Sequence, residues 1–201
     1  LLSNLLVYTR PDCSRRGWHE TEVLIREVLT LASHAIPPGS IEVRCQVHPL
    51  VPQLWCDGPK MKQVLLNLVL NAVQAMPKGG TLTLTACPAT SEAPESPAVR
   101  ITVSDTGTGI PAELQSRVFD PFFTTKDQGT GLGLAIVHAL IEAHHGRIDV
   151  ESSPGHGTSF LITLPRGPMQ TASSSVPLVT VSDRPESARE ITGVTEEKRY
   201  E

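Results

Sequence analysis

Three stretches of the chain are expected to be helical, and in the first two apolar side chains recur at every third or fourth position, which is the spacing of a helix with one buried face. The first stretch covers 21–35 and ends before two prolines. The second follows Asp57-Gly58-Pro59, a start signal because proline is tolerated in a first helical turn. The third covers 132–144, with Gly146 as its expected cap. The second helix has the longest apolar stripe, formed by Met61, Val64, Leu65, Leu68, Val69, Ala72, Val73 and Met76.

Between these helices, apolar and polar residues alternate as they do in strands that are buried on one face. The alternating segments are 41–47, 81–86, 99–103 and the pair 148–150 and 160–164, and 53–56 is a further short candidate. The stretch between the second and third of them is rich in Pro, Ala, Ser and Glu and predicts an exposed hairpin loop. This order of elements implies an α/β (α+β) two-layer sandwich, with helices packed on one face of a mixed β-sheet.

The two ends of the chain differ from this middle part. Residues 1–11 predict a short apolar helix that Pro11 stops, whereas residues after 165 show little periodicity. We therefore expect a helix remnant with a linker at 1–19, a folded domain at 20–165 and a disordered tail at 166–201. Because the chain begins with Leu-Leu-Ser rather than Met, it is expected to be a fragment of a longer protein.

Composition narrows the class of protein. A hydrophobic content of 39% suffices for an ordinary core, which Leu, Val, Ile and Ala must fill because aromatic residues are only 4%. The net charge of −4 argues against a nucleic-acid partner, which requires a basic surface. Four cysteines at wide spacing predict neither a zinc site nor a disulfide framework. No apolar run is long enough to cross a bilayer, so a cytoplasmic domain is expected.

Four motifs in a fixed order carry the functional signal. They are Asn67-Leu-Val-Leu-Asn71, Asp105-Thr-Gly-Thr-Gly109, Phe119-Asp-Pro-Phe-Phe123 and Gly129-Thr-Gly-Leu-Gly133. Together they resemble the N, first glycine, F and second glycine boxes of bacterial sensor histidine kinases, whose ATP-binding domain belongs to the GHKL superfamily with its Bergerat-type fold. The resemblance covers about 57–165. Among these kinases, the chain is similar to the nitrogen-regulation group. Residues 1–11 resemble the end of the dimerisation helices of these kinases.

The first motif lies on the longest predicted helix. Helical spacing places Gln63, Asn67 and Asn71 along one edge of its apolar stripe. A carboxamide at such a position requires a polar partner, although helix edges are also commonly solvated. The resemblance implies that Asn71 binds Mg²⁺ through its carbonyl oxygen and that Asn67 orients the phosphates or the water shell of the metal.

The second motif follows a predicted buried strand. Asp105 at the strand end can accept a hydrogen bond from an exocyclic amine, and Gly107 and Gly109 let the backbone come close to a flat ring. The resemblance implies that this aspartate binds the amino group of adenine. Asp-x-Gly is also an ordinary turn sequence, so the motif alone would not establish a site.

The last glycine motif runs directly into the third helix. The motif residues are Gly129, Thr130, Gly131, Leu132 and Gly133. Free N–H groups and the positive end of a helix dipole favour an anion at such a start. Lys126 can place a positive charge near terminal phosphates, and the resemblance puts Thr158 near them too. Phe119, Phe122 and Phe123 are expected to anchor a lid or its docking surface on the dimerisation helices, with core filling as the alternative.

None of the histidines fits the phosphoacceptor box of the family. His19-Glu20 is the single His-Glu pair, but the sequence after it does not match and the pair follows the predicted helix remnant. The sequence therefore predicts the Mg-ATP-binding catalytic domain of a two-component kinase. The acceptor of the γ-phosphate of ATP would be a histidine on the dimerisation helices of a homodimeric parent protein. A cognate response regulator would be the next partner. Whether that parent is anchored in the inner membrane stays open.

Three alternatives remain at this point. GHKL ATPases carry a glutamate as general base one helical turn before the metal-binding asparagine, where this chain has Asn67, which cannot take a proton at neutral pH. An anti-sigma serine kinase shares the fold. A module that uses the fold only to bind a partner would not need the pocket residues.

Overall fold

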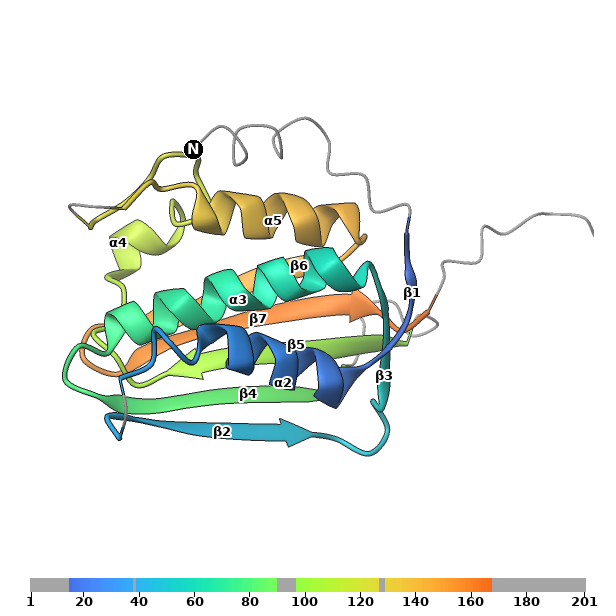
Figure 1. Ribbon diagram of the computed structural model, residues 1–201. Coiled ribbons are helices and arrows are strands. Elements are labelled where there is room, and N and C mark those ends of the chain that lie inside the picture. The colour runs from blue at the N-terminus through green and yellow to red at the C-terminus, as the bar shows by residue number, and fades with distance from the viewer. Residues whose placement is uncertain (1–14, 38, 90–96, 127–128, 168–201) are drawn as a thin grey trace, which may run out of the picture. The chain divides into compact units, whose positions relative to one another are not determined.

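The computed structural model describes residues 15–37, 39–89, 97–126 and 129–167. These residues form a five-stranded sheet, a two-stranded sheet and a layer of helices (Figure 1). The elements are β1 (Gly17–Glu20), α2 (Thr21–Ala32), β2 (Ile41–Val47), β3 (Gln53–Cys56), α3 (Gly58–Ala75), β4 (Gly80–Ala89), β5 (Ala98–Asp105), α4 (Ala112–Gln115), α5 (Gly133–Ala143), β6 (Arg147–Ser153) and β7 (Gly157–Pro165).

The larger sheet has the strand order β2-β4-β5-β7-β6. β2 pairs parallel to β4, and the other neighbours pair antiparallel, so the sheet is mixed. Helices α2, α3 and α5 lie on one face of it (Figure 1). The predicted two-layer sandwich is therefore confirmed.

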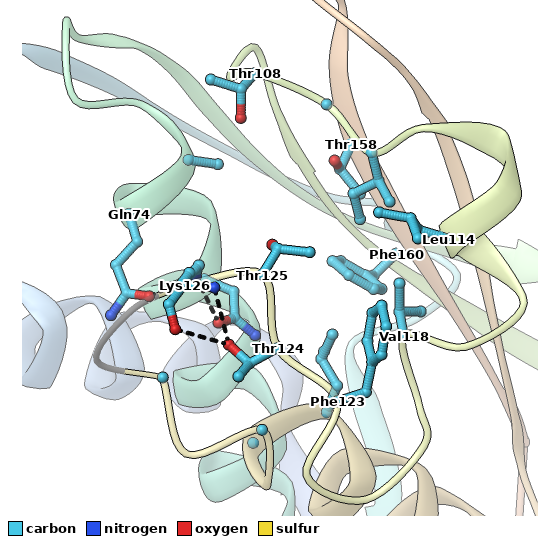
Figure 2. Close-up of a pocket in the computed structure, with 18 of the residues that line it drawn as sticks. Gln74, Thr108, Leu114, Val118, Phe123, Thr124, Thr125, Lys126, Thr158 and Phe160 are labelled. Carbon is cyan, nitrogen blue, oxygen red and sulfur yellow. Dashed lines mark hydrogen bonds between the residues drawn. The ribbon is translucent and has the colours of Figure 1, made fainter.

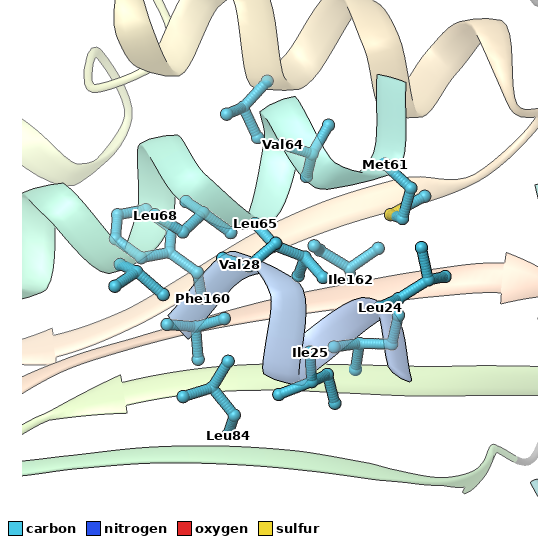
Figure 3. Close-up of a cluster of buried hydrophobic side chains, with 14 of the residues drawn as sticks. Leu24, Ile25, Val28, Met61, Val64, Leu65, Leu68, Leu84, Phe160 and Ile162 are labelled. Atoms are coloured by element: carbon cyan, nitrogen blue, oxygen red, sulfur yellow. The ribbon is translucent and has the colours of Figure 1, made fainter. Parts of the chain in front are cut away.

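The core lies between the helices and this face of the sheet. Figure 3 shows Leu24, Ile25 and Val28 of α2 beside the stripe of α3, with side chains of the sheet beneath them. Burying a side chain of this size stabilises the fold by about 1.5–3 kcal/mol relative to leaving it exposed. The predicted stripe of α3 is buried along its whole length, and Met61, Val64, Leu65, Leu68 and Val69 are each 0% exposed.

Helix α3 starts where the sequence predicts. Asp57 is its N-cap, and its side chain accepts a hydrogen bond from the Lys60 N–H at 3.2 Å, which satisfies one of the unpaired donors of the first turn. Pro59 occupies the first turn at no hydrogen-bonding cost. α3 therefore has a fixed start, and its polar edge has a fixed position relative to the sheet.

Two predictions about strands need correction. The alternating residues of 41–47 predict a half-buried strand, but Val43 is 38% exposed and Cys45 is exposed. The reason is that β2 is an edge strand with a neighbour on one side only. The second correction is β1, which sequence patterning did not predict and which pairs antiparallel with β3.

β1 also changes the expected domain boundary. A boundary between 19 and 20 would cut through the strand, and Arg16 just before it donates from its guanidinium to the carbonyl of Ala143 at the end of α5. The folded domain therefore includes residues before 20. The expected helix at 1–11, the loop between β4 and β5 at 90–96, and the tail from 168 onward lie outside the described residues. Among the described helices, none is long and apolar enough to cross a membrane.

The end of α5 differs from the prediction of a glycine cap at Gly146. His145 takes the left-handed conformation (φ 58°), and its N–H donates to Glu142 O at 2.8 Å. The N–H of Gly146 donates to Ile141 O at 3.0 Å, which completes a Schellman arrangement. Gly146 is required for another reason, because a Cβ there would lie 2.7 Å from the Thr163 carbonyl of β7.

His144 joins the end of α5 to the start of α3. It is 3% exposed, its Nε2 accepts from the Asp57 N–H at 3.0 Å and its Nδ1 lies 2.7 Å from Leu140 O. These partners require a neutral ring with the proton on Nδ1. Burial lowers the pKa of His144, and the Leu140 carbonyl opposes this effect.

This histidine predicts a pH-dependent stability. Because the folded-state pKa of His144 lies below the unfolded value of about 6.5, the unfolded chain binds more protons as pH falls through that value. The free energy of unfolding should therefore decrease between about pH 7.5 and 5.5. Urea titrations at both pH values should show a smaller decrease for His144→Gln than for the wild type. His34→Gln, at an exposed histidine, should leave the decrease unchanged.

Candidate nucleotide-binding site

A cavity of about 710 Å³ lies between the last turns of α3, the end of β5, α4 and the first turn of α5. Apolar side chains gather on one side of it, with Leu114, Val118 and Phe160 labelled in Figure 2. Polar side chains, including Gln74, Thr124 and Lys126, lie on the other side. Nine of the predicted site residues line it: Asn71, Asp105, Gly109, Lys126, Gly129, Thr130, Gly131, Gly133 and Thr158.

Asp105 is the only carboxylate among the residues described as lining the cavity. It is 5% exposed, and its Oδ1 accepts from the Gly107 N–H at 2.8 Å. Burial raises the pKa of Asp105, while hydrogen bonds from the backbone of Gly107 and Thr158 and the charge of Lys126 act in the opposite direction. Backbone donors thus fix the carboxylate at the strand end. In this position it can accept a hydrogen bond from a flat polar group in the cavity.

The glycines after Asp105 allow the turn to pack tightly. A Cβ on Gly107 would lie 2.4 Å from Ala75 O at the end of α3, so Gly107 supports the cavity from behind and does not line it. Gly109 has φ +70°, and a Cβ there would lie 2.0 Å from Ser153 O. The turn is also bonded on both sides, because Thr108 N–H donates to Ala75 O and Gly155 N–H donates to Thr108 O. Both glycines therefore permit close packing of the turn against neighbouring backbone, and their approach to a flat ring stays a prediction.

Thr158 lines the cavity next to Asp105. The two residues are direct partners in the pairing of β5 and β7, and the Thr158 hydroxyl lies 2.9 Å from Ser152 Oγ. Figure 2 shows Thr158 on the side where the apolar residues gather, away from Lys126. Its contacts thus associate Thr158 with the aspartate, and its expected position near the phosphates stays a prediction.

The two asparagines of α3 have different surroundings. Asn71 lines the cavity, whereas Asn67 does not. The Asn67 Nδ2 lies 3.5 Å from Gly133 O, a long contact that joins α3 to the first turn of α5. Gln74 continues the polar edge one turn after Asn71 and also lines the cavity. Sequence patterning did not single out Gln74, because it lies three residues after Asn71 and not at the four-residue spacing of Gln63, Asn67 and Asn71.

The second glycine motif brings the start of α5 to the cavity. Its N-cap, Leu132, is 8% exposed, belongs to the core and provides no side-chain cap, so the first N–H groups of α5 have no capping partner among the described side chains. Gly131 has φ +66°, and a Cβ there would lie 2.3 Å from the Phe122 backbone. Phe122 N–H donates to Gly131 O at 2.9 Å, so the F box and this glycine motif are bonded together.

The three phenylalanines have separate roles. Phe119 packs against the core, with its ring centroid 6.3 Å from that of Phe160 and 5.5 Å from that of His138. Phe123 lines the cavity, and the Arg117 guanidinium lies 4.8 Å from its ring centroid. Phe122 is 69% exposed and has a positive φ of 65°. Core filling therefore holds for Phe119, and Phe122 remains available to a docking partner.

Comparison with known proteins defines the class. The profile of a family described as "Histidine kinase-, DNA gyrase B-, and HSP90-like ATPase" matches residues 56–168, which is more than half of the 201-residue chain. The chain belongs to this family. The predicted membership of the GHKL superfamily is therefore confirmed.

Sensor histidine kinases are among the relatives that this chain matches. The chain is 39% identical over 166 residues to the sensor histidine kinase ZraS of Escherichia coli strain K12, a match that covers 82% of this chain and 34% of that protein. It thus spans about a third of the length of this curated relative.

Solved structures of histidine kinases share the fold. The nucleotide-free catalytic domain of ThkA matches at 35% identity with a TM-score of 0.66, covering 77% of this chain and 97% of that one. A second structure, of ThkA in complex with the response regulator TrrA, matches at 29% identity with a TM-score of 0.66, covering 84% of this chain and 47% of that one. Full-length ShkA in complex with AMPPNP matches at 29% identity with a TM-score of 0.72, covering 83% of this chain and 35% of that one.

The glycines of the cavity wall provide a test of its geometry. Gly109→Ala should lower the free energy of unfolding by roughly 2 kcal/mol or more, because left-handed backbone costs a residue with a Cβ about 1–2 kcal/mol and the methyl group would also meet Ser153 O. At Gly133, an added Cβ would have no atom within 4 Å. The free energy of unfolding of Gly133→Ala should therefore be no more than about 0.5 kcal/mol below that of the wild type, and it can exceed the wild-type value. Urea unfolding distinguishes the two, and equal losses would contradict this geometry.

Proposed function

We propose that this chain binds Mg-ATP and positions its γ-phosphate for transfer to a histidine on dimerisation helices. The observation that carries the proposal is the division of the cavity. One side offers apolar side chains around the fixed carboxylate of Asp105, which suits a base with an exocyclic amine. The other side offers the ammonium of Lys126 and the uncapped start of α5, which suit a triphosphate.

The residues present also fit a magnesium ion that arrives with the nucleotide. The described residues contain no group of three or more His, Cys, Asp or Glu side chains that could hold a metal. Asn71 offers a hard amide oxygen at the polar side of the cavity. Mg²⁺ is commonly held by one or two protein oxygens together with phosphate oxygens and waters, which matches this donor set. When bound, the ion would neutralise charge on the β- and γ-phosphates.

The donor set favours a kinase over an ATPase. Activation of a water molecule requires a base within reach of it, and Asp105 is the only carboxylate among the described lining residues. That carboxylate is engaged by backbone N–H groups on the apolar side. Asn67 stands where the ATPases of this superfamily have a glutamate, and its amide faces Gly133 O instead. The cavity therefore holds and orients a phosphoryl donor without providing a base for hydrolysis.

The partners follow from the same proposal. The acceptor histidine would lie on dimerisation helices of the same kinase, in a homodimeric parent protein, and none of the histidines in these 201 residues fits the acceptor box. ThkA, which shares the fold, has been solved in complex with a response regulator, and a cognate response regulator is proposed as the next phosphoryl acceptor here. A cytoplasmic position of this domain is part of the proposal, whether or not a parent protein is anchored in the inner membrane.

Removal of the buried charge in the cavity tests the nucleotide assignment. Asp105→Asn keeps an oxygen that can accept from the Gly107 N–H, so the fold should persist, but it loses a charge-assisted bond to the base. We expect ATP and ADP affinity to fall by about tenfold to hundredfold, the equivalent of about 1.5–3 kcal/mol. Calorimetry measures both proteins. A folded wild type that binds neither nucleotide would remove the proposal and leave the partner-binding module as the alternative.

The reaction itself requires a second component. With labelled Mg-ATP, the 201-residue chain should hydrolyse nucleotide slowly and remain essentially unlabelled, because its described cavity has a donor site without a base. Adding dimerisation helices from the parent protein should produce an acid-labile phosphohistidine on the added piece. Rapid turnover without a partner, or label on His19, would favour the ATPase or overturn the acceptor assignment. Acid-stable label on serine would favour the serine kinase.

A further inference from the structure

The ammonium group of Lys126 is held by two amide oxygens of α3. Lys126 Nζ donates to Gln74 Oε1 at 2.6 Å and lies 3.4 Å from Asn71 Oδ1. The Lys126 backbone N–H is also bonded to Thr124 Oγ1 at 3.1 Å. The side chain of Lys126 thus attaches its segment to α3. The shorter of its two contacts is the one with Gln74.

These two oxygens come from residues one helical turn apart. Asn71 and Gln74 are i and i+3 on α3, so their side chains lie on the same edge and converge on one cation. Amide oxygens are the acceptors that an ammonium ion and a hard metal ion share. Although much of Lys126 is exposed to solvent, burial of its ammonium end lowers the pKa of the side chain, and the charge of Asp105 opposes that effect.

We propose that Gln74 is a positioning residue that holds Lys126 against α3 in the nucleotide-free state, in place of the cation that the site receives with nucleotide. The biological role of this contact rests on the proposed function, whereas the contact itself can be measured in nucleotide-free protein. In the structure, the ammonium contacts the same Asn71 oxygen that is proposed to bind Mg²⁺. Lys126 cannot keep both amide contacts while an ion occupies that oxygen, since two cations repel each other at such distances.

The consequence is an exchange of partners. With Mg-nucleotide present, the Asn71 oxygen would hold the ion, and the ammonium of Lys126 would be free to donate to phosphate oxygens, which are stronger acceptors. Nucleotide without Mg²⁺ must instead remove Lys126 from Gln74 with no ion to take its place. Gln74 therefore lowers the affinity for metal-free nucleotide and keeps the neighbouring segment ordered while the cavity is empty.

Two substitutions at Gln74 have opposite expected effects, which separates positioning from a merely structural role. Gln74 is exposed on α3, so Gln74→Leu and Gln74→Glu should both fold. Leucine removes the acceptor, and glutamate replaces it with a charged one. In nucleotide-free and Mg²⁺-free protein, amide exchange of 123–126 and 129–131 should be about three- to tenfold faster in Gln74→Leu and slower in Gln74→Glu, the range expected for the net contribution of one solvent-exposed hydrogen bond.

Gln63→Leu is the matched control. Gln63 is the same residue type on the same helix, and it does not line the cavity. Its substitution should leave exchange of 123–126 and 129–131 at the wild-type rate. A second measurement is calorimetry with ADP in EDTA, where Gln74→Leu should bind about threefold more tightly than the wild type, with a smaller difference in excess Mg²⁺.

The outcomes separate this inference from the proposed function. Unchanged exchange in Gln74→Leu, faster exchange in both Gln74 variants, or an equal effect of Gln63→Leu would overturn the positioning role even if the wild type binds ATP. Opposite shifts in the two Gln74 variants would support it. If the wild type then bound no nucleotide, the contact would stand and the proposed function would fall.

Discussion

Burial of one face of α3 is the constraint on which the rest of the structure depends. The stripe from Met61 to Val73 contacts α2, α5 and the sheet, so the helix cannot rotate without exposing several apolar side chains. Asn71 and Gln74 lie at the edge of that stripe and are therefore carried to the cavity by the packing of their neighbours. The hydrophobic core thus decides where the polar groups of the site point.

The same helix is fixed at its first turn by residues far away in the sequence. Asp57 caps α3 with its side chain, while its backbone N–H donates to the buried ring of His144 at the end of α5. The ring of His19 in β1 packs against Gly58, where a Cβ would come within 2.7 Å of it. The beginning of the described chain, the helix with the asparagines and the helix that starts at the glycine motif are therefore joined at one point. A displacement of β1 would act on both helices that border the cavity.

The cavity combines rigid and weakly held walls. Asp105 and the turn after it are fixed by backbone bonds to α3 and to the β6–β7 turn, so the proposed base-binding side is formed before any ligand arrives. The opposite wall is attached by Lys126, Thr124 and the bond between Phe122 and Gly131. These are few contacts with little apolar burial, and such segments are the ones that rearrange when a ligand binds.

The amino-acid sequence by itself determined α2, α3 and α5, most of the large sheet, the family and nine of the residues that line the cavity, but not the short helix α4. It did so because apolar periodicity, glycine turns and motif order are local properties of the chain. It did not predict β1, the exposed position of β2 or the left-handed cap at His145, since each depends on which strand or helix end lies next to it.

The contact of Lys126 with Gln74, the engagement of Asn67 by the start of α5 and the pairing of Thr158 with Asp105 were likewise decided only by the tertiary structure. These pairs lie 52, 66 and 53 positions apart along the chain. No local pattern specifies which partner a polar side chain meets over such a separation, because that is settled when the core packs and the two chain segments are brought together.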